Sequence, residues 1–452
     1  MTRQPGRHPT MHAPRTFGCA ALMLATAVAP VPRALAQSTP EQRIGQLESE
    51  IAALKDQIRK IEEDRAGAGT VLAPGPRFAS DDGAFTFRLR GRVEMDAAGF
   101  NVREGSRDLN SGTELRRARL GMEGSMYEDW FYRLEADFAG ASRDDRDGQE
   151  VDVKDAFVRY QPGSAYVVTA GQHKTPNSLE RLASSASLTF LERASVVEAF
   201  TDRANAGGDY KVGLSTDVYG EAWTLAAGVF GENVAITGAG GADEGFGLHA
   251  RATAVPASWD DGFLHLGVSA YWRSAGGAGN VRFGDRPEVR VDGTRLVDTG
   301  NIAADSYGFS GLEAVASWGP ASLQSEYARV WVDSGAGGRD PSFDGAYVTL
   351  AYFLTGETLP YRRGLIEAVK PLAPFDPAAG QWGAFQVAAR YSTIDLDDDG
   401  IAGGEADNWT LGLNWYLNAN LRAMLNYVRF DTTRAGAPLD GDALALRVGF
   451  IW

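Results

Sequence analysis

The sequence predicts an all-β fold: a transmembrane barrel of sixteen antiparallel strands, preceded by a short N-terminal coiled-coil helix. Three observations lead to this prediction. Apolar and polar residues alternate along many short segments, and the gaps between these segments alternate between long and short. Beyond the N-terminal region, no run of about 18 apolar residues occurs that could form a spanning helix. Strands of alternating polarity can cross a membrane while the mean hydropathy stays low.

The first 36 residues are typical of a secretory signal peptide. Three arginines precede an apolar run at 17–29, and the small residues 34–36 suit a cleavage site before Gln37. The one cysteine, Cys19, falls inside this segment. The mature chain would therefore have no disulfide framework and no thiolate chemistry.

Residues 40–65 carry the strongest helix signal. Their Ile and Leu residues recur at alternating spacings of three and four, which forms an a/d heptad seam. Fewer than three heptads are marginal alone, so we expect this coiled coil to need self-association or support from its assembly. The alternative is a lone amphipathic helix packed on its own domain. A linker rich in Gly, Ala and Pro follows at 66–83.

The barrel is predicted over residues 84–452. In its first segment, 84–96, the odd positions are apolar or glycine and most even positions are charged. Successive side chains of a strand point to opposite faces, so one face would contact lipid and the other a hydrated lumen. The predicted strands are 84–96, 114–124, 129–138, 152–160, 165–172, 208–219, 221–231, 245–255, 262–273, 306–317, 320–332, 343–354, 382–393, 407–418, 420–431 and 441–452.

The gaps between these strands alternate in length. Odd-numbered gaps are long, as at 173–207, whereas most even-numbered gaps are tight turns, as at 161–164. Long loops on one side and short turns on the other are typical of outer-membrane barrels. Residues 355–381 break this rule, because they fall on the short-turn side, and the sequence offers no physical reason for their length. The chain ends on a lipid-facing aromatic, Trp452, a residue type that collects at membrane interfaces.

Composition excludes several classes of function. The formal net charge is −15, which argues against nucleic acid as a partner. No nucleophile with its base and no metal-ligand cluster occurs at a recognisable spacing, so neither an enzyme nor a cofactor is predicted. Residues 395–400 match the opening of a calcium loop, but Ala406 occupies its last ligand position. An acidic external loop is favoured over a bound divalent cation at 395–406.

Basic residues recur on the lumen-facing parity of the first two predicted strands. A barrel of sixteen strands encloses an aqueous channel, whose selectivity depends on its radius and wall charge. Because neighbouring strands lie about 4.8 Å apart, these residues would form a basic patch with carboxylates among them. The patch is either a pathway for anions or a set of Arg–Glu pairs that stiffen the wall. Its members are Arg88, Arg90, Arg92, Arg117 and Arg119.

The loop at 173–207 is a second candidate element. It combines serines, arginines and a lysine with apolar residues. If it folds into the lumen, it would narrow the channel and bring together hydroxyl and guanidinium donors that suit phosphate. The alternative is an external cap over the barrel.

Several motifs resemble the phosphate-selective porin O and P family, in the same order along nearly all of the mature chain. The resemblance implies a homotrimeric, sixteen-stranded porin in the outer membrane of a Gram-negative bacterium, in contact with lipid and lipopolysaccharide. It also implies small anions as the solute, with phosphate or pyrophosphate in the best-known members. The motifs include 114–124 (ELRRARLGMEG), 132–139 (YRLEADFA), 153–160 (VKDAFVRY), 171–193, 351–357 (AYFLTGE), 388–396 (AARYSTIDL) and 410–427.

The resemblance further implies a set of binding residues. Paired arginines that enter the second strand correspond to Arg116 and Arg117. Because Arg116 has lipid-facing parity, a role in the lumen requires that this strand begin irregularly. An aspartate of the fourth strand corresponds to Asp155. The loop at 173–207 would contribute Arg181, Ser184, Ser185 and Arg193.

These observations favour passive diffusion of small anions through a basic constriction. Two alternatives stay open. A general or weakly cation-preferring pore would fit the acidic net charge and the carboxylates of the wall. A structural protein whose coiled coil contacts peptidoglycan would fit the heptad seam at 40–65.

Overall fold

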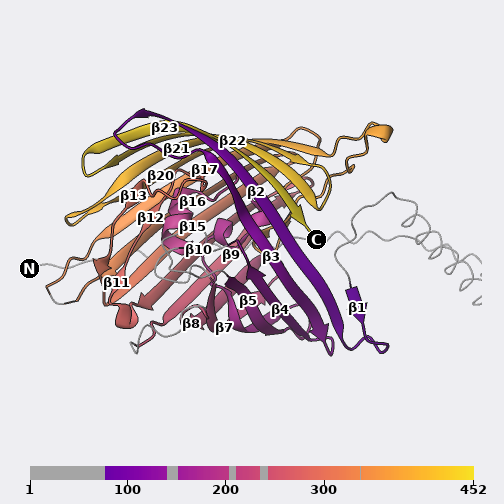
Figure 1. Cartoon of the computed structure of the whole chain (residues 1–452). Helices are drawn as coiled ribbons and strands as arrows, with labels where there is room; N and C mark the ends of the chain where they lie inside the picture. Colours follow the sequence, from indigo (N-terminus) through magenta and orange to yellow (C-terminus); the bar gives the residue numbers. More distant parts are fainter. Residues whose placement is uncertain (1–76, 140–150, 203–209, 235–242, 336) are drawn as a thin grey trace, which may run out of the picture. The chain divides into compact units, whose positions relative to one another are not determined.

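Segments of alternating polarity form one closed antiparallel sheet in the computed structural model (Figure 1). The predicted signal peptide, the coiled coil and most of the linker lie outside the described residues. Within the described part of the chain, no helix combines the length and apolar character needed to cross a membrane. The structure describes residues 77–139, 151–202, 210–234, 243–335 and 337–452.

Sixteen strands close the described sheet into a barrel. Each pairs with the next along the chain, and the first, β2, pairs with the last, β23. A further three-residue strand, β1 (Arg77–Ala79), adds to β2. All sixteen predicted strands are therefore confirmed. Their bounds are β2 Thr86–Glu104, β3 Gly112–Met126, β4 Trp130–Asp137, β5 Asp152–Tyr160, β6 Tyr166–Lys174, β7 Tyr210–Tyr219, β8 Trp223–Phe230, β9 Gly247–Trp259, β10 Gly262–Ser274, β15 Ser306–Trp318, β16 Ala321–Asp333, β17 Ser342–Phe353, β20 Ala384–Asp398, β21 Ile401–Tyr416, β22 Leu421–Arg434 and β23 Ala437–Ile451.

The two faces of the strands match the predicted parities. On β2, the outward Met95 is 60% exposed, whereas Arg92 and Asp96 are buried on the inner face. On β21, Trp409 and Leu411 are exposed on the outer face. The apolar face therefore points away from the lumen, as a lipid-facing wall requires.

Several strands extend beyond their predicted ends on the side of the long gaps. β2 continues to Glu104, and β20 and β21 meet in a hairpin whose turn is Asp399–Gly400. The two turn residues have φ of 46° and 74°, which suits the primed turns of tight hairpins. Acidic residues and glycines dominate this hairpin, so the apolar alternation that predicts a strand is weak there.

The acidic segment 395–406 is thus a hairpin rather than an open loop. Asp397 accepts a hydrogen bond from the Gly404 N–H (2.6 Å), and Asp398 accepts one from the Ser342 N–H (2.7 Å). These carboxylates therefore stabilise backbone turns. In the described residues, no group of three or more His, Cys, Asp or Glu side chains is placed to hold a metal ion.

Part of the barrel interior is packed rather than hydrated, which corrects the expectation of an aqueous channel throughout. The loop between β6 and β7 folds as α2 (Leu179–Leu182), η1 (Ser185–Ser187), α3 (Ser195–Val197) and η2 (Glu198–Asp202). The loop between β10 and β15 contains η3 (Gly276–Ala278), β11 (Asn280–Val281), β12 (Gly284–Asp285), β13 (Val297–Asp298) and β14 (Ile302–Ala303).

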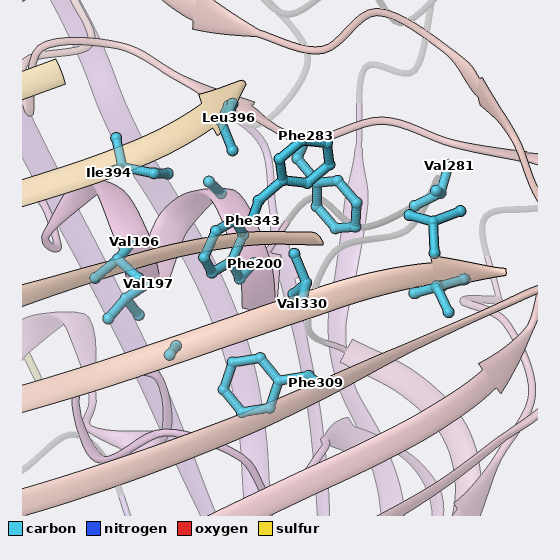
Figure 2. Close-up of a cluster of buried hydrophobic side chains, with 14 of the residues drawn as sticks. Val196, Val197, Phe200, Val281, Phe283, Phe309, Val330, Phe343, Ile394 and Leu396 are labelled. Atoms are coloured by element: carbon cyan, nitrogen blue, oxygen red, sulfur yellow. The ribbon is translucent and has the colours of Figure 1, made fainter. Parts of the chain in front are cut away.

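Both loops meet apolar side chains of the inner wall in one buried cluster (Figure 2). Phe200 and Phe283 come from the two loops, and their ring centroids are 5.8 Å apart. Phe309 and Phe343 come from β15 and β17. Packing the loops against these inner-face aromatics removes apolar area from water, which stabilises the loops inside the barrel. The two loops therefore fill the side of the lumen that β15 to β20 enclose.

The first part of the long segment 355–381 also enters the barrel, which gives a physical reason for part of its length. Its hairpin of β18 (Tyr361–Arg362) and β19 (Leu365–Ile366) lies against the inner wall. The Gly364 carbonyl accepts a hydrogen bond from Arg251 of β9 (2.7 Å). Ile366 packs with Leu179 of α2 and with Val315 of β15. Loops from both ends of the barrel therefore meet inside it.

The seam between β2 and β23 depends on a glycine. Gly91 and Trp452 exchange two backbone hydrogen bonds of 3.0 Å each, and the Trp452 ring covers Gly91, where a Cβ would lie 2.0 Å from Cζ2. We expect Gly91→Leu to displace this ring and destabilise the closed barrel by about 1–3 kcal/mol, measured by guanidinium unfolding in detergent. Gly99→Ala on the same strand is the control, because its nearest neighbour atom is 3.9 Å away. Equal unfolding midpoints for the two variants would contradict this role.

Candidate functional site

A cavity of about 310 Å³ lies inside the barrel. It is bounded by the wall formed by β2 to β9, by the loop between β6 and β7, and by the β18–β19 hairpin. Cationic side chains outnumber carboxylates among the residues that line it. The carboxylates are Glu135, Asp155 and Asp217. The cationic residues are Arg90, Arg92, Arg119, Arg133, Arg159, Lys174, Arg251 and Arg363.

Most arginines of the wall pair with carboxylates. Arg90 contacts Glu123 (2.8 Å) and Glu135 (2.9 Å). Arg119 contacts Asp137 (2.8 Å) and Glu135 (3.3 Å). Such pairing fixes the guanidiniums in position and consumes part of their charge. For these two arginines the pairing matches the alternative of a stiffened wall.

Arg92 brings the wall and the loop together at the cavity. Its guanidinium donates to the hydroxyls of Ser185 and of Ser184, the latter at 3.0 Å. Its nearest carboxylate contact is Glu94, at 3.9 Å. Three of the residues that the family resemblance and the strand parity indicated thus meet at one point, where hydroxyl and guanidinium donors face the lumen.

Arg116 reaches the lumen because β3 is irregular. The register with β2 shifts between Glu94 and Met95, so that Leu115 pairs with Met95 and Arg117 with Glu94. Arg116 is the extra residue, as in a β-bulge, which redirects a side chain. The structure therefore contains the irregular start that the parity of Arg116 required.

Glu192 of the loop lies among guanidiniums of the wall. Arg116 binds it through Nε (2.7 Å) and Nη2 (2.9 Å), and Arg447 of β23 binds it at 2.7 Å. Burial disfavours its charge, but the attraction of Arg116 and Arg447 outweighs this cost and holds the pKa of Glu192 well below its usual range. Arg117 contacts Glu94 and lies 3.9 Å from Glu192. Arg116 and Arg117 thus position the loop and do not line the cavity.

Arg181 and Arg193 also stand apart from the cavity, contrary to the role implied by the resemblance. Arg193 donates to the carbonyls of Glu180 (2.9 Å) and Ala183 (3.1 Å). Both guanidiniums contact Glu198, at 3.7 Å from Arg181 and 3.5 Å from Arg193. Both side chains are buried inside the loop, where Arg193 satisfies backbone carbonyls that need donors. Their position indicates that they maintain the shape of the loop.

The two remaining predicted residues lie on the wall. Arg88 pairs with Glu123 and does not line the cavity. Asp155 lines the cavity and contacts Arg133 at 3.3 Å.

Two lining arginines have no carboxylate within 4.0 Å in the described residues. Arg159 donates to the Thr169 hydroxyl (3.2 Å) and lies over the Phe157 ring, 5.0 Å from its centroid. Arg363 donates to the Ser164 carbonyl (3.3 Å) and lies over the ring of Tyr219 at 4.4 Å. Each of these two guanidiniums is therefore held by one oxygen acceptor and an aromatic ring rather than by a direct ion pair.

Sequence reasoning missed three cationic residues of the cavity: Arg159, Arg251 and Arg363. Strand parity could have found the first two, because they share the inner face with Asp155 and His249. No local pattern marks Arg363, which lies in the turn of the inward hairpin with a φ of 50°.

Comparison with known proteins identifies the family of this barrel. The family model for phosphate-selective porin O and P matches residues 87–452, which is the whole sixteen-stranded barrel. The chain belongs to the phosphate-selective porin O and P family. This porin is accordingly an outer-membrane protein of a Gram-negative bacterium.

Two relatives cover most of this porin. A Caulobacter vibrioides protein of unassigned function is 33% identical over 382 residues, which are 81% of this chain and 72% of that protein. Porin O of Pseudomonas aeruginosa is 27% identical over 439 residues, 86% of this chain and 95% of that protein. The solved anion-selective porin from Comamonas acidovorans has a TM-score of 0.52 at 15% identity, with 81% of this chain and 100% of that chain covered. This last similarity shows the fold alone.

Proposed function

We propose that this outer-membrane porin passes small anions, phosphate and pyrophosphate among them, by passive diffusion through the basic cavity. The observation that supports this proposal most directly is the excess of cationic over carboxylate side chains around the cavity. A focused positive potential raises the local concentration of anions. No covalent chemistry takes part.

The donors of the cavity would replace part of the hydration shell of an anion. Arg92 together with Ser184 and Ser185 offers such donors at the level of the loop. Arg159 and Arg363 offer them further along the cavity. Arginine presents planar, forked donors that match phosphate oxygens. The spread of these groups would allow an anion to move from one to the next without strong binding at any of them.

Selectivity in planar bilayers tests the proposal. In a potassium chloride gradient, we expect a reversal potential with the sign of chloride preference. Added phosphate or pyrophosphate should reduce the chloride current in a saturable manner, because both compete for the same donors. A reversal potential that favours potassium would refute the proposal.

A general diffusion pore is the second candidate. The carboxylates that pair with Arg90 and Arg119 favour it, because they reduce the net positive charge of the wall. A channel of that kind would show weak selectivity between chloride and potassium, and phosphate would leave its chloride current unchanged.

A further inference from the structure

The cavity contains apolar surface as well as charge. Leu182 of α2, Leu365 of β19 and Tyr219 of β7 line it, and each is only partly buried. They come from three separate segments of the chain and converge on one space. A pathway for inorganic ions alone gains nothing from apolar side chains exposed to its water, whereas pockets for organic ligands combine apolar surface with a few polar groups.

The two lining arginines without a carboxylate within 4.0 Å lie beside this apolar surface. Arg363 lies over the ring of Tyr219, and it is two residues from Leu365 in the same hairpin. Arg159 lies over the ring of Phe157 in the same cavity. A guanidinium that stacks on an aromatic ring has its N–H groups in the guanidinium plane. Those N–H groups can still donate hydrogen bonds at the edge of the stack to an anionic group. One ligand could therefore bind a guanidinium through its charged group and contact the apolar side chains with the rest of its structure.

The size of the cavity agrees with a ligand larger than an inorganic ion. Its volume of about 310 Å³ equals that of roughly ten water molecules at about 30 Å³ each. Inorganic phosphate would occupy a minor part of that space. An organic phosphate with a six-membered ring would also fit within it.

We propose that the cavity favours organic anions, in which a phosphate head group is joined to a small planar apolar body. The head group binds Arg159 or Arg363, and the body contacts Leu182, Leu365 and Tyr219. This inference rests on the proposed anion pathway and specifies its substrate class.

Inhibition of chloride current by two probes with the same head group tests the inference. Phenyl phosphate should half-inhibit the wild-type current at a concentration roughly tenfold below that of methyl phosphate, because burial of a ring is favourable. Leu365→Asn should reduce this ratio to about threefold and leave inhibition by methyl phosphate unchanged. Leu372→Asn is the matched control, since Leu372 belongs to the same inward segment, is 74% exposed and does not line the cavity.

Leu182→Asn supplies a second variant from a different segment, in case the hairpin variant does not fold. Equal inhibition of the wild type by the two probes would overturn the inference and leave the anion pathway intact. An unchanged ratio in both variants would overturn it too, because the apolar contacts would then lie elsewhere. A potassium-selective reversal potential would refute the proposed function itself, and the inference with it.

Discussion

Replacing Glu192 with alanine is expected to release the loop that contains α2 to α3 from the inner wall and to raise single-channel conductance by roughly twofold or more. The reason is electrostatic. Glu192 pairs with Arg116 and Arg447 in the barrel interior, and removal of one partner from such a buried group costs about 3–5 kcal/mol. Without this carboxylate, the guanidiniums would repel one another and draw water into the contact. Conductance in planar bilayers, with trypsin cleavage of the loop as a second readout, measures the effect.

Glu367→Ala provides the control for this variant. Glu367 and Arg362 form a solvent-exposed pair, with side chains 44% and 71% exposed, and exposed pairs contribute about 0–1 kcal/mol. The wild type should also keep its conductance unchanged in mild acid. The pKa of Glu192 is depressed below its ordinary value of 4.5, so the stabilisation is present above that value and is lost only as pH falls through the lower folded-state pKa. Unaltered conductance in the Glu192 variant would show that other contacts hold the loop.

Reversal of charge at Arg159 and Arg363 is expected to have the second large effect, on selectivity. The double variant Arg159→Glu, Arg363→Glu removes the two lining arginines that have no carboxylate within 4.0 Å among the described residues, and it adds two negative charges. Because the other wall arginines that line the cavity are largely paired, the net potential should change sign. The reversal potential in a potassium chloride gradient should move from chloride preference to potassium preference.

Arg362→Glu is the matched control for charge. Arg362 is the neighbour of Arg363 in the hairpin, but its side chain is 71% exposed and it does not line the cavity. This variant should keep the selectivity of the wild type. If the double variant remained as chloride-selective as the control, the proposed pathway would run elsewhere.

The strands were predictable because a barrel strand leaves a local signal. Outward residues such as Met95 and Leu411 must be apolar, and their neighbours face the lumen, so parity alone gives strand position and side-chain direction. The same signal placed Arg90, Arg92 and Arg119 on the lumen side. The alternation of apolar and polar residues weakens where the strands extend beyond the lipid-facing part of the wall. For this reason the sequence does not predict the strand ends near Glu104 and Asp399.

The inward segments were not predictable in this way, because long-range pairs determine their position. Glu288 of the loop between β10 and β15 accepts hydrogen bonds from Ser392 (2.5 Å) and Thr410 (2.8 Å), and it pairs with Arg390. Nothing in the sequence around Glu288 marks it as the partner of an arginine 102 residues away. Arg193 shows the same limit, since a motif identifies the residue but not the backbone carbonyls to which it donates.

The seam at Gly91 and Trp452 also constrains how the polypeptide reaches its native state. Asp96 and Arg447, which pair across this seam, are 351 residues apart in sequence. Contacts between residues so far apart in sequence cost much conformational entropy to form, and they form slowly during folding. The edges of β2 and β23 that face each other therefore stay unpaired until both strands have formed, and during that interval the incomplete sheet is exposed to aggregation.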